Sequence, residues 1–304
     1  MRPTVVLRSA TRILVVYIAY AGAGLAHDDV PDANAASLRS TYAALQDKLS
    51  HNQFERPLYL DSRENQGELR GEVYAIVEYS FPTVNADLRA PNHWCDILNL
   101  HLNVKYCNAA ADKARPTLTT FVGRKHDEPL EAAHRMEFVF RCGSQNPDYL
   151  HVHLDAETGP FGTRNYHIMV EAIPLEDERT FVHLAYSYAY TAGASFAMQT
   201  YLKTFGANKV GFTVVDKQPD GQPVYVGKMR GVLERNTMRY YLAIDAYLHA
   251  LSAPLHERFE KRIRGWFAAT ERYSLQLHEV DEREYIEMKR SEFRRQQEPR
   301  EVAQ

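Results

Sequence analysis

The most constraining feature of the sequence is a repeated alternation of apolar and polar residues through its central part. Such alternation places the apolar side chains of each segment on one face of a strand. Short segments rich in Gly, Pro, Asp and Asn separate the alternating stretches and are typical of hairpin connections. We therefore expect a long antiparallel meander, curved over one apolar face. The expected strands are Leu98–Tyr106, Pro116–Arg124, Arg135–Cys142, Tyr149–Asp155, Arg164–Ile173 and Thr180–Tyr190.

Other elements flank this meander. Before it, Leu69–Tyr79 alternates as an earlier strand, and Thr83–Leu98 is typical of two short helices broken at Pro91. The polar segment Arg56–Gly67 is expected to be a connection, and Pro31–His51 an amphipathic helix. After the meander, we expect a helix at Ala194–Phe205, a hairpin at Lys209–Val232, a long helix at Glu234–Leu251 and further helices beyond Pro254.

The order of these elements resembles that of the START-like, or helix-grip, superfamily. The segments that carry the resemblance are EVYAIVEYSFPTVNADLRAPNHWCDIL, with Phe81, Pro82 and Trp94, and the late helix RNTMRYYLAIDAYL. The resemblance implies an α+β fold in which a curved antiparallel sheet grips a long C-terminal helix, here with extra helices after it. Members of this superfamily include lipid-transfer domains, plant allergen relatives and aromatic cyclases, so the resemblance also implies a cavity between sheet and helix.

The N-terminus has the pattern of an export signal. Arg2, Arg8 and Arg12 precede an uncharged apolar stretch that ends with small residues at Gly24 and Ala26. This stretch of about 14 residues is shorter than the roughly 20 needed to span a bilayer. We expect cleavage after Ala26 and a periplasmic or secreted protein, with an uncleaved membrane anchor as the alternative. The expected divisions are 1–26 signal peptide, 27–67 N-terminal helix and connection, 68–251 START-like domain and 252–304 C-terminal helical extension.

The three cysteines fit an oxidising compartment. Cys95 and Cys107 are close in sequence and are expected to form a disulfide, although two buried free thiols would also fit the pattern. Cys142 ends an apolar strand pattern and is expected to be a buried structural thiol. With 36 Lys and Arg against 39 Asp and Glu, the net charge of −3 gives no basic field for a nucleic-acid partner.

No motif indicates a cofactor. The sequence has neither a phosphate-binding loop nor a dinucleotide fingerprint after a strand. The run His151, His153 and Asp155 is similar to one in binuclear zinc hydrolases, but there another His directly follows the Asp, and here Ala156 does. His153 and His167 could become cross-strand neighbours, with His183 extending the row, but we expect these residues on the outward face and predict no metal.

An inward face rich in aromatic residues is the best candidate for a binding site. A concave, mostly apolar site is the default place for a ligand, although a completely filled core would produce the same pattern. Glu234, Arg235 and Arg239 are interpreted as charge pairs on the surface of the late helix. The expected ligand-binding residues are Phe138, Phe140, Tyr186, Tyr188, Tyr190, Tyr241, Asp245 and Leu248.

Three functions remain open. The preferred one is an exported protein that binds a hydrophobic or amphipathic, lipid-like molecule without chemistry. The second is a cyclase- or hydrolase-like enzyme that uses Tyr186, Tyr188 or Asp245 in the same cavity. The third is a structural envelope protein whose helices after Pro254 bind a protein partner or a membrane surface.

Overall fold

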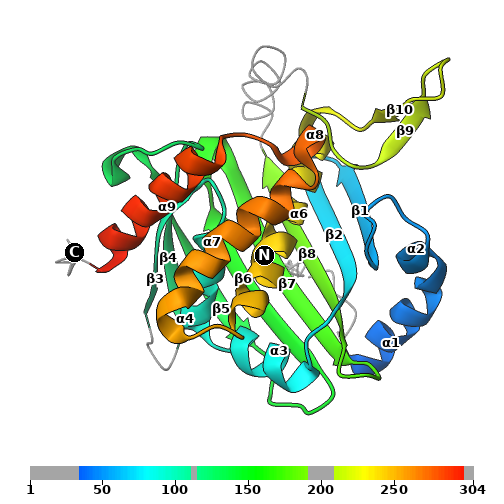
Figure 1. The fold of residues 1–304 in the computed structure, drawn as a ribbon, viewed down its shortest axis with the longest axis horizontal. Helices are drawn as coiled ribbons and strands as arrows, with labels where there is room; N and C mark the ends of the chain where they lie inside the picture. The colour runs from blue at the N-terminus through cyan, green and yellow to red at the C-terminus, as the bar shows by residue number, and fades with distance from the viewer. Residues whose placement is uncertain (1–33, 111–114, 191–208, 298–304) are drawn as a thin grey trace, which may run out of the picture. The chain divides into compact units, whose positions relative to one another are not determined.

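The structure, a computed structural model, describes residues 34–110, 115–190 and 209–297. The expected signal peptide with its cleavage site at Ala26 and the expected helix at Ala194–Phe205 lie outside these residues. One eight-stranded antiparallel sheet dominates the described part, with the strand order β1-β2-β8-β7-β6-β5-β4-β3 (Figure 1). Its strands are β1 Leu58–Asn65, β2 Glu68–Val77, β3 Val104–Ala110, β4 Thr117–Val122, β5 His134–Cys142, β6 Leu150–Thr158, β7 Thr163–Pro174 and β8 Thr180–Tyr190.

Helices cover both faces of this sheet. A small hairpin of β9 (Val214–Lys217) and β10 (Pro223–Tyr225) precedes the long helix α6. The short turns η1 (Leu130–Ala132) and η2 (Pro160–Gly162) connect strands. Within the described ranges, no helix is both long and apolar enough to cross a bilayer. The helices are α1 Ala35–Ala44, α2 Gln46–Ser50, α3 Phe81–Leu88, α4 Pro91–Leu98, α6 Lys228–Ala250, α7 Leu255–Glu271, α8 Ser274–Leu277 and α9 Glu282–Gln297.

The predicted fold class is confirmed, because a curved antiparallel sheet holds the long helix α6 against its inner face. The approach of α6 to β2 requires a glycine. A Cβ atom at Gly71 would lie 2.3 Å from the Oγ1 atom of Thr237 and 3.3 Å from Leu233, both on α6. Any side chain at Gly71 would therefore push α6 off the sheet.

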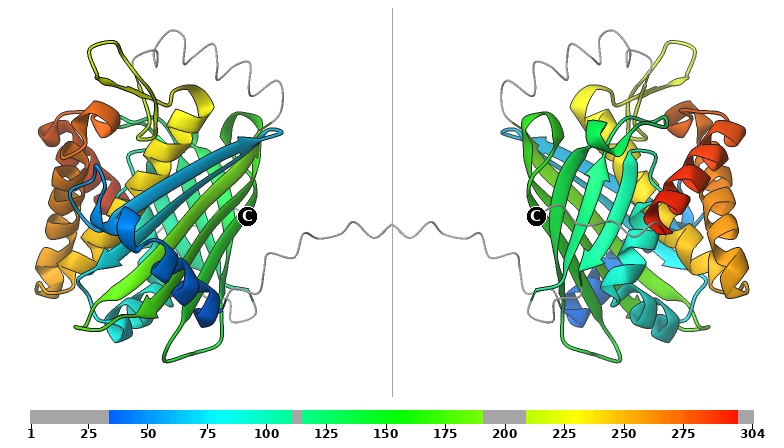
Figure 2. Two further views of the ribbon diagram at one scale, coloured as in Figure 1. Left: turned by 90° about the vertical axis from the view of Figure 1, so that its right-hand side faces the viewer. Right: turned by 90° about the vertical axis from the view of Figure 1, so that its left-hand side faces the viewer.

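Apolar alternation forms the inner face, as predicted. In β6, Leu150, Val152 and Leu154 are buried completely, and the matching residues of β8 are buried with them. Helices α1 and α2 lie on the opposite side of the sheet from α6 (Figure 2), where Leu38 packs near Ile173 and Phe181 in a second, smaller core.

The C-terminal helices contribute to the main core. α7 packs along α6 and buries Ile263 and Trp266, and α9 buries Tyr285 beside them. The Trp266 indole donates a hydrogen bond to the main-chain carbonyl of Arg239 on α6 at 3.1 Å. The predicted extension at 252–304 thus completes the enclosure of α6.

One strand was missed in the sequence. The segment Arg56–Gly67, expected to be a connection, contains β1, so the sheet begins before the predicted domain boundary at 68. Leu58 and Leu60 are buried, but the next inward residue is Ser62, and polar residues follow it. The apolar alternation is therefore too short to show a strand. β1 is held by pairing with β2 through the tight turn at Gln66 and Gly67, both of positive φ.

Two predicted boundaries were also wrong. The strand expected at Leu98–Tyr106 begins only at Val104, because Leu98 ends α4 and residues 99–103 form tight turns after it. Leu100 and Leu102 are buried in those turns, and their spacing imitates a strand. The hairpin expected to end at Val232 ends at Tyr225, and α6 begins at Lys228 rather than at Glu234.

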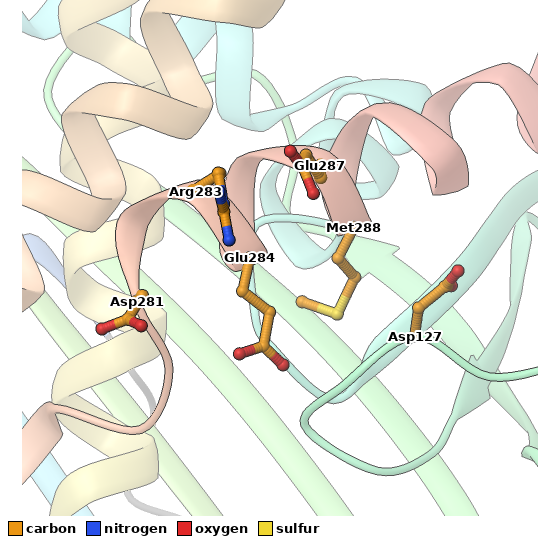
Figure 3. Close-up of a pocket in the computed structure, with 6 residues that line it drawn as sticks. All are labelled: Asp127, Asp281, Arg283, Glu284, Glu287 and Met288. Carbon is orange, nitrogen blue, oxygen red and sulfur yellow. The ribbon is translucent and has the colours of Figure 1, made fainter.

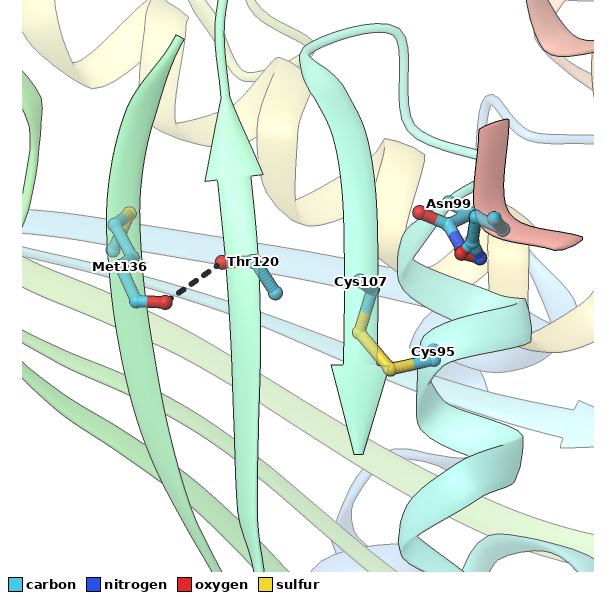
Figure 4. The surroundings of a disulfide bond; sticks show 6 residues. Cys95, Asn99, Cys107, Thr120 and Met136 are labelled. Carbon is cyan, nitrogen blue, oxygen red and sulfur yellow. Dashed lines mark hydrogen bonds between the residues drawn. A yellow bond between two sulfur atoms is a disulfide. The ribbon is translucent and has the colours of Figure 1, made fainter. Parts of the chain in front are cut away.

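The predicted disulfide between Cys95 and Cys107 is present and connects α4 to the edge strand β3 (Figure 4). Both residues are buried, and their Cα atoms are 5.2 Å apart. Cys142 is free and half-buried, less enclosed than expected, and burial raises the pKa of its thiol.

A buried histidine joins three strands on the outer face. His183 on β8 lies between two carboxylates, at 2.9 Å from Glu171 on β7 and 3.2 Å from Glu72 on β2. Its ring stacks on Tyr74, with 4.2 Å between the ring centroids. Burial alone would lower the pKa of His183, but the hydrogen bonds with the two carboxylates outweigh it and raise that pKa.

We predict that Cys95→Ala combined with Cys107→Ala lowers the free energy of unfolding by about 3 kcal/mol, because the unfolded chain loses its loop constraint. Denaturant unfolding measures this change. Dithiothreitol should destabilise the wild type and leave the double variant unchanged, and Cys142→Ala should keep the sensitivity of the wild type. A double variant as stable as the wild type under oxidising conditions would contradict the prediction.

We predict that His183→Gln lowers the free energy of unfolding by about 2 kcal/mol near pH 6, with a smaller loss near pH 9. The pKa of His183 is raised in the folded state, so its stabilisation is complete below the unfolded pKa of about 6.5 and is lost as the pH rises through the folded pKa. Urea unfolding across this range measures the difference. The control is His126→Gln, at an exposed position. An equal loss at both pH values would contradict the interpretation that protonated His183 bridges Glu72 and Glu171.

Candidate functional site

Four tyrosines from three elements form one cluster between the sheet and α6. Tyr166 on β7 stacks on Tyr188 of β8 with ring centroids 5.2 Å apart, and Tyr186 lies 5.6 Å from Tyr188. Tyr240 of α6 lies 5.0 Å from Tyr186. We call Tyr166, Tyr186, Tyr188 and Tyr240 the tyrosine cluster.

Three of the four hydroxyls of the tyrosine cluster have no hydrogen-bond partner among the described residues. Tyr166 shares a hydrogen bond of 2.7 Å with the hydroxyl of Thr163. In the part of the chain that the structure describes, the hydroxyls of Tyr186, Tyr188 and Tyr240 have no hydrogen-bond partner. Burial raises the pKa of all three, so the phenols stay protonated at neutral pH and can act as hydrogen-bond donors.

Burial differs between the two ends of the inner face. Toward the β5–β6 turn, Val152 and Leu184 are completely buried, as in a filled core. Toward the β6–β7 turn at η2, Tyr188 keeps 6% of its surface exposed and Tyr166 keeps 8%. Small residual exposures of 3–5% continue across this end at Met136, Phe138, Phe140, Ala156 and Tyr186. The residual exposure of the inner face is therefore concentrated at the tyrosine end.

The predicted ligand-binding residues divide between this end and other places. Phe138, Phe140, Tyr186 and Tyr188 lie on the inner face at or near the tyrosine cluster. Tyr190, at the end of β8, is only half-buried and donates a hydrogen bond to Glu64 across the hairpin edge.

The other predicted residues belong to α6. Tyr241 and Leu248 are buried core residues. Asp245 forms an ion pair of 3.1 Å with Arg56, and the guanidinium of Arg56 also donates to the Tyr241 hydroxyl at 2.7 Å. The Asp245 carboxylate is thus engaged in fixing the segment before β1 to α6.

The two best-defined hollows of the described residues lie elsewhere. The larger, of about 400 Å³, lies beside α9 (Figure 3) and is lined by Asp127, Asp281, Arg283, Glu284, Glu287 and Met288. The smaller, of about 10 Å³, is enclosed between α7, α8 and α9. The larger hollow is lined mainly by charged side chains, and the smaller one, although mostly apolar, is too small for a ligand.

His153 and His167 are not directly opposite each other in the sheet, unlike the pairing considered from the sequence. His153 faces Met169, and the residue opposite His167 is Asp155, which bonds its ring. His183 is occupied by its two carboxylates. Among the described residues, no group of three or more His, Cys, Asp or Glu side chains is arranged to hold a metal ion.

A second cluster, of charged residues, was not foreseen. Arg235 and Arg239 were interpreted as surface residues, but they are only 4% and 2% exposed, since α7 and the loop after α8 cover this side of α6. Arg239 pairs with Glu279 at 2.8 Å, and Lys125 pairs with the same carboxylate at 2.7 Å. Lys209 approaches Glu279 at 3.6 Å. We call Lys125, Lys209, Arg235, Arg239 and Glu279 the cationic cluster.

The two clusters are neighbours. Arg235 interacts electrostatically with Tyr188, and the ring of His101 stacks on Tyr240 at 4.9 Å while lying within the field of Arg239 and Lys125. Burial, followed by the nearby Arg239, Lys289 and Lys125, lowers the pKa of His101 and keeps its ring neutral. Only the helical spacing of Arg235 and Arg239 is visible in the sequence, because the other members come from distant loops.

No protein-family model matches the chain, and no curated protein is similar to it in sequence. Its fold is similar to several solved structures. A STAR-related lipid transfer protein from Xanthomonas axonopodis is 13% identical, with a TM-score of 0.33 over 48% of this chain and 86% of that one. Norcoclaurine synthase from Thalictrum flavum is 14% identical, with a TM-score of 0.33 over 49% of this chain and 91% of that one.

The human StarD13 lipid transfer and protein localization domain is 6% identical, with a TM-score of 0.32 over 47% of this chain and 76% of that one. These likenesses concern about half of the chain. The helix-grip assignment comes from the observed sheet and from the packing of α6 against it. The fold is α+β and START-like in its order of elements.

Proposed function

We propose that this protein binds a hydrophobic or amphipathic small molecule between the sheet and α6, at the tyrosine cluster. The observation that carries the proposal is the set of hydroxyls on Tyr186, Tyr188 and Tyr240, which have no hydrogen-bond partner among the described residues and lie in an otherwise apolar face. A ligand with a polar group can form hydrogen bonds with these hydroxyls while its apolar part covers the surrounding face.

The residual exposure at the tyrosine end supports the same location. Ala156 has a small side chain directly opposite Tyr166 in the β6–β7 register, and Phe138 contributes an aromatic wall beside it. Aromatic walls with a few polar groups are typical of sites for small amphipathic molecules.

We further propose that the protein acts after export. The Cys95–Cys107 disulfide supports an oxidising compartment, since such bonds persist mainly in extracellular and periplasmic proteins. The expected signal peptide at 1–26 agrees with this location.

We predict that Tyr186→Phe combined with Tyr188→Phe weakens binding of oleyl alcohol, a probe with one hydroxyl, by about three- to tenfold. The loss of two hydroxyls without partners should change the free energy of unfolding by less than about 0.5 kcal/mol. Fluorescence displacement measures the affinity, and urea unfolding measures the stability.

Tyr166→Phe is the matched control, because it removes a hydroxyl that already has a partner in Thr163. It should lower the free energy of unfolding by about 1 kcal/mol. Native mass spectrometry of the purified protein provides an independent check. Protein that carries no co-purified small molecule and binds no oleyl alcohol would reject the proposed function.

A further inference from the structure

The cationic cluster has an excess of positive charge. Four cationic side chains surround the single carboxylate of Glu279, and Arg235 forms no ion pair with any described residue. One nitrogen of Arg235 donates to the main-chain carbonyl of Val210 at 3.1 Å. Burial, together with the nearby Arg239, lowers the pKa of Arg235 to about 10 and that of Lys125 to about 8. These shifts reflect the cost of holding the cations together.

Two buried nitrogen atoms at this place have no partner among the described residues. The Nε atom of Arg239 is enclosed and unpaired, although its terminal nitrogens reach Glu279, Leu277 and Asn236. The Nε2 atom of His101 is also enclosed and unpaired. The Nδ1 atom of His101 accepts from the main-chain nitrogen of Asn103 at 3.2 Å, so Nε2 carries the proton. The Asn236 side chain interacts with this ring and raises its pKa, but it does not reach hydrogen-bond geometry at Nε2.

The cluster is open on one side and adjoins the tyrosines on the other. Lys125 and Lys209 keep about a third of their side-chain surface exposed, at 33% and 31%. Arg235 lies beside Tyr188, as described above. The sequence that leads from β8 to Lys209, residues 191–208, contains no Asp or Glu that could supply a further carboxylate.

We propose that the cationic cluster binds the anionic end of an amphipathic ligand, a carboxylate or a phosphate, while its hydrocarbon part lies at the tyrosine cluster. This inference rests on the proposed function and specifies its ligand class. The anion accepts hydrogen bonds from the free nitrogens of Arg235 and from the Tyr188 hydroxyl, and it balances the charge of Lys125 and Arg239. Guanidinium groups suit both carboxylate and phosphate oxygens.

Three probes with the same hydrocarbon chain test this inference on the full chain: oleate, oleoyl lysophosphatidate and oleyl alcohol. Titration calorimetry should give the wild type at least tenfold higher affinity for one of the anions than for the alcohol, since a charge-assisted hydrogen bond contributes at least this much. Preference for oleate identifies a carboxylate ligand, and preference for lysophosphatidate identifies a phosphate ligand.

Arg235→Gln should reduce the affinity for the preferred anion about tenfold and leave the affinity for oleyl alcohol unchanged. Arg230→Gln is the matched control on the same helix, since the Arg230 charge is already balanced by Glu234 at 3.8 Å. If Arg235→Gln fails to fold, the partly exposed Lys125→Gln serves instead, with a loss of about threefold expected for the anion.

The outcomes separate this inference from the proposed function. Equal affinities of the wild type for anion and alcohol, unaffected by Arg235→Gln, would overturn the anion site and keep the hydrophobic one. Failure of all three probes to bind would overturn both. An equal loss for anion and alcohol in Arg235→Gln would show a structural role for this arginine and reject the anion site.

Discussion

Helix α6 is enclosed between the sheet and α7, and the polar side chains along it cannot rely on water. The structure meets this constraint fully for Glu234, which is completely buried. Its carboxylate accepts hydrogen bonds from the main-chain nitrogens of Phe212 and Thr213 at 2.6 and 2.9 Å, and from hydroxyls on both sides. The same helix presents Arg235 and Arg239 to its other side, where the described residues supply one carboxylate in an ion pair, that of Glu279 with Arg239. The buried polar residues of α6 therefore fall into two kinds: Glu234, whose carboxylate has several donors, and Arg235 and Arg239, which share few acceptors.

Much of the sheet could be predicted because its inner face is regular. From β4 to β8, apolar side chains alternate over six to twelve residues, and the predicted strands match the observed ones closely. The errors occur where a buried position is polar, or where buried apolar residues alternate outside a strand. β1 carries an inward Ser62 because that residue bonds Glu234 of α6, a contact invisible from local sequence. Leu100 and Leu102 imitate a strand because both are buried in turns after α4.

The site could be predicted only in part, for a similar reason. The alternation that predicts β5 and β8 also places four of the eight expected ligand-binding residues on the inner face: Phe138, Phe140, Tyr186 and Tyr188. For charged residues, the local sequence gives no comparable indication that the side chain is buried. Arg235 and Arg239 have the spacing of an ordinary exposed helix face, and their burial depends on α7 and on Glu279, which lie far away in the sequence. Asp245 shows the reverse case, since its partner Arg56 comes from a segment without a recognisable pattern.

A second buried group of cations shows what a closed arrangement looks like. Lys105 and Lys289 share the carboxylate of Glu292 between β3 and α9, at 3.2 and 2.7 Å. Their ammonium groups also donate to main-chain carbonyls of the turn after α4, including those of Leu102 and His101. Burial lowers the pKa of Lys289 to about 8, yet both ammonium groups have protein acceptors. Around Arg239, by contrast, the described residues supply the main-chain carbonyl of Leu277, the Asn236 side chain and one carboxylate, that of Glu279, and the Nε atom remains unpaired. The two cationic groups therefore differ in the acceptors that the described residues supply, and a ligand anion can complete the group that has too few.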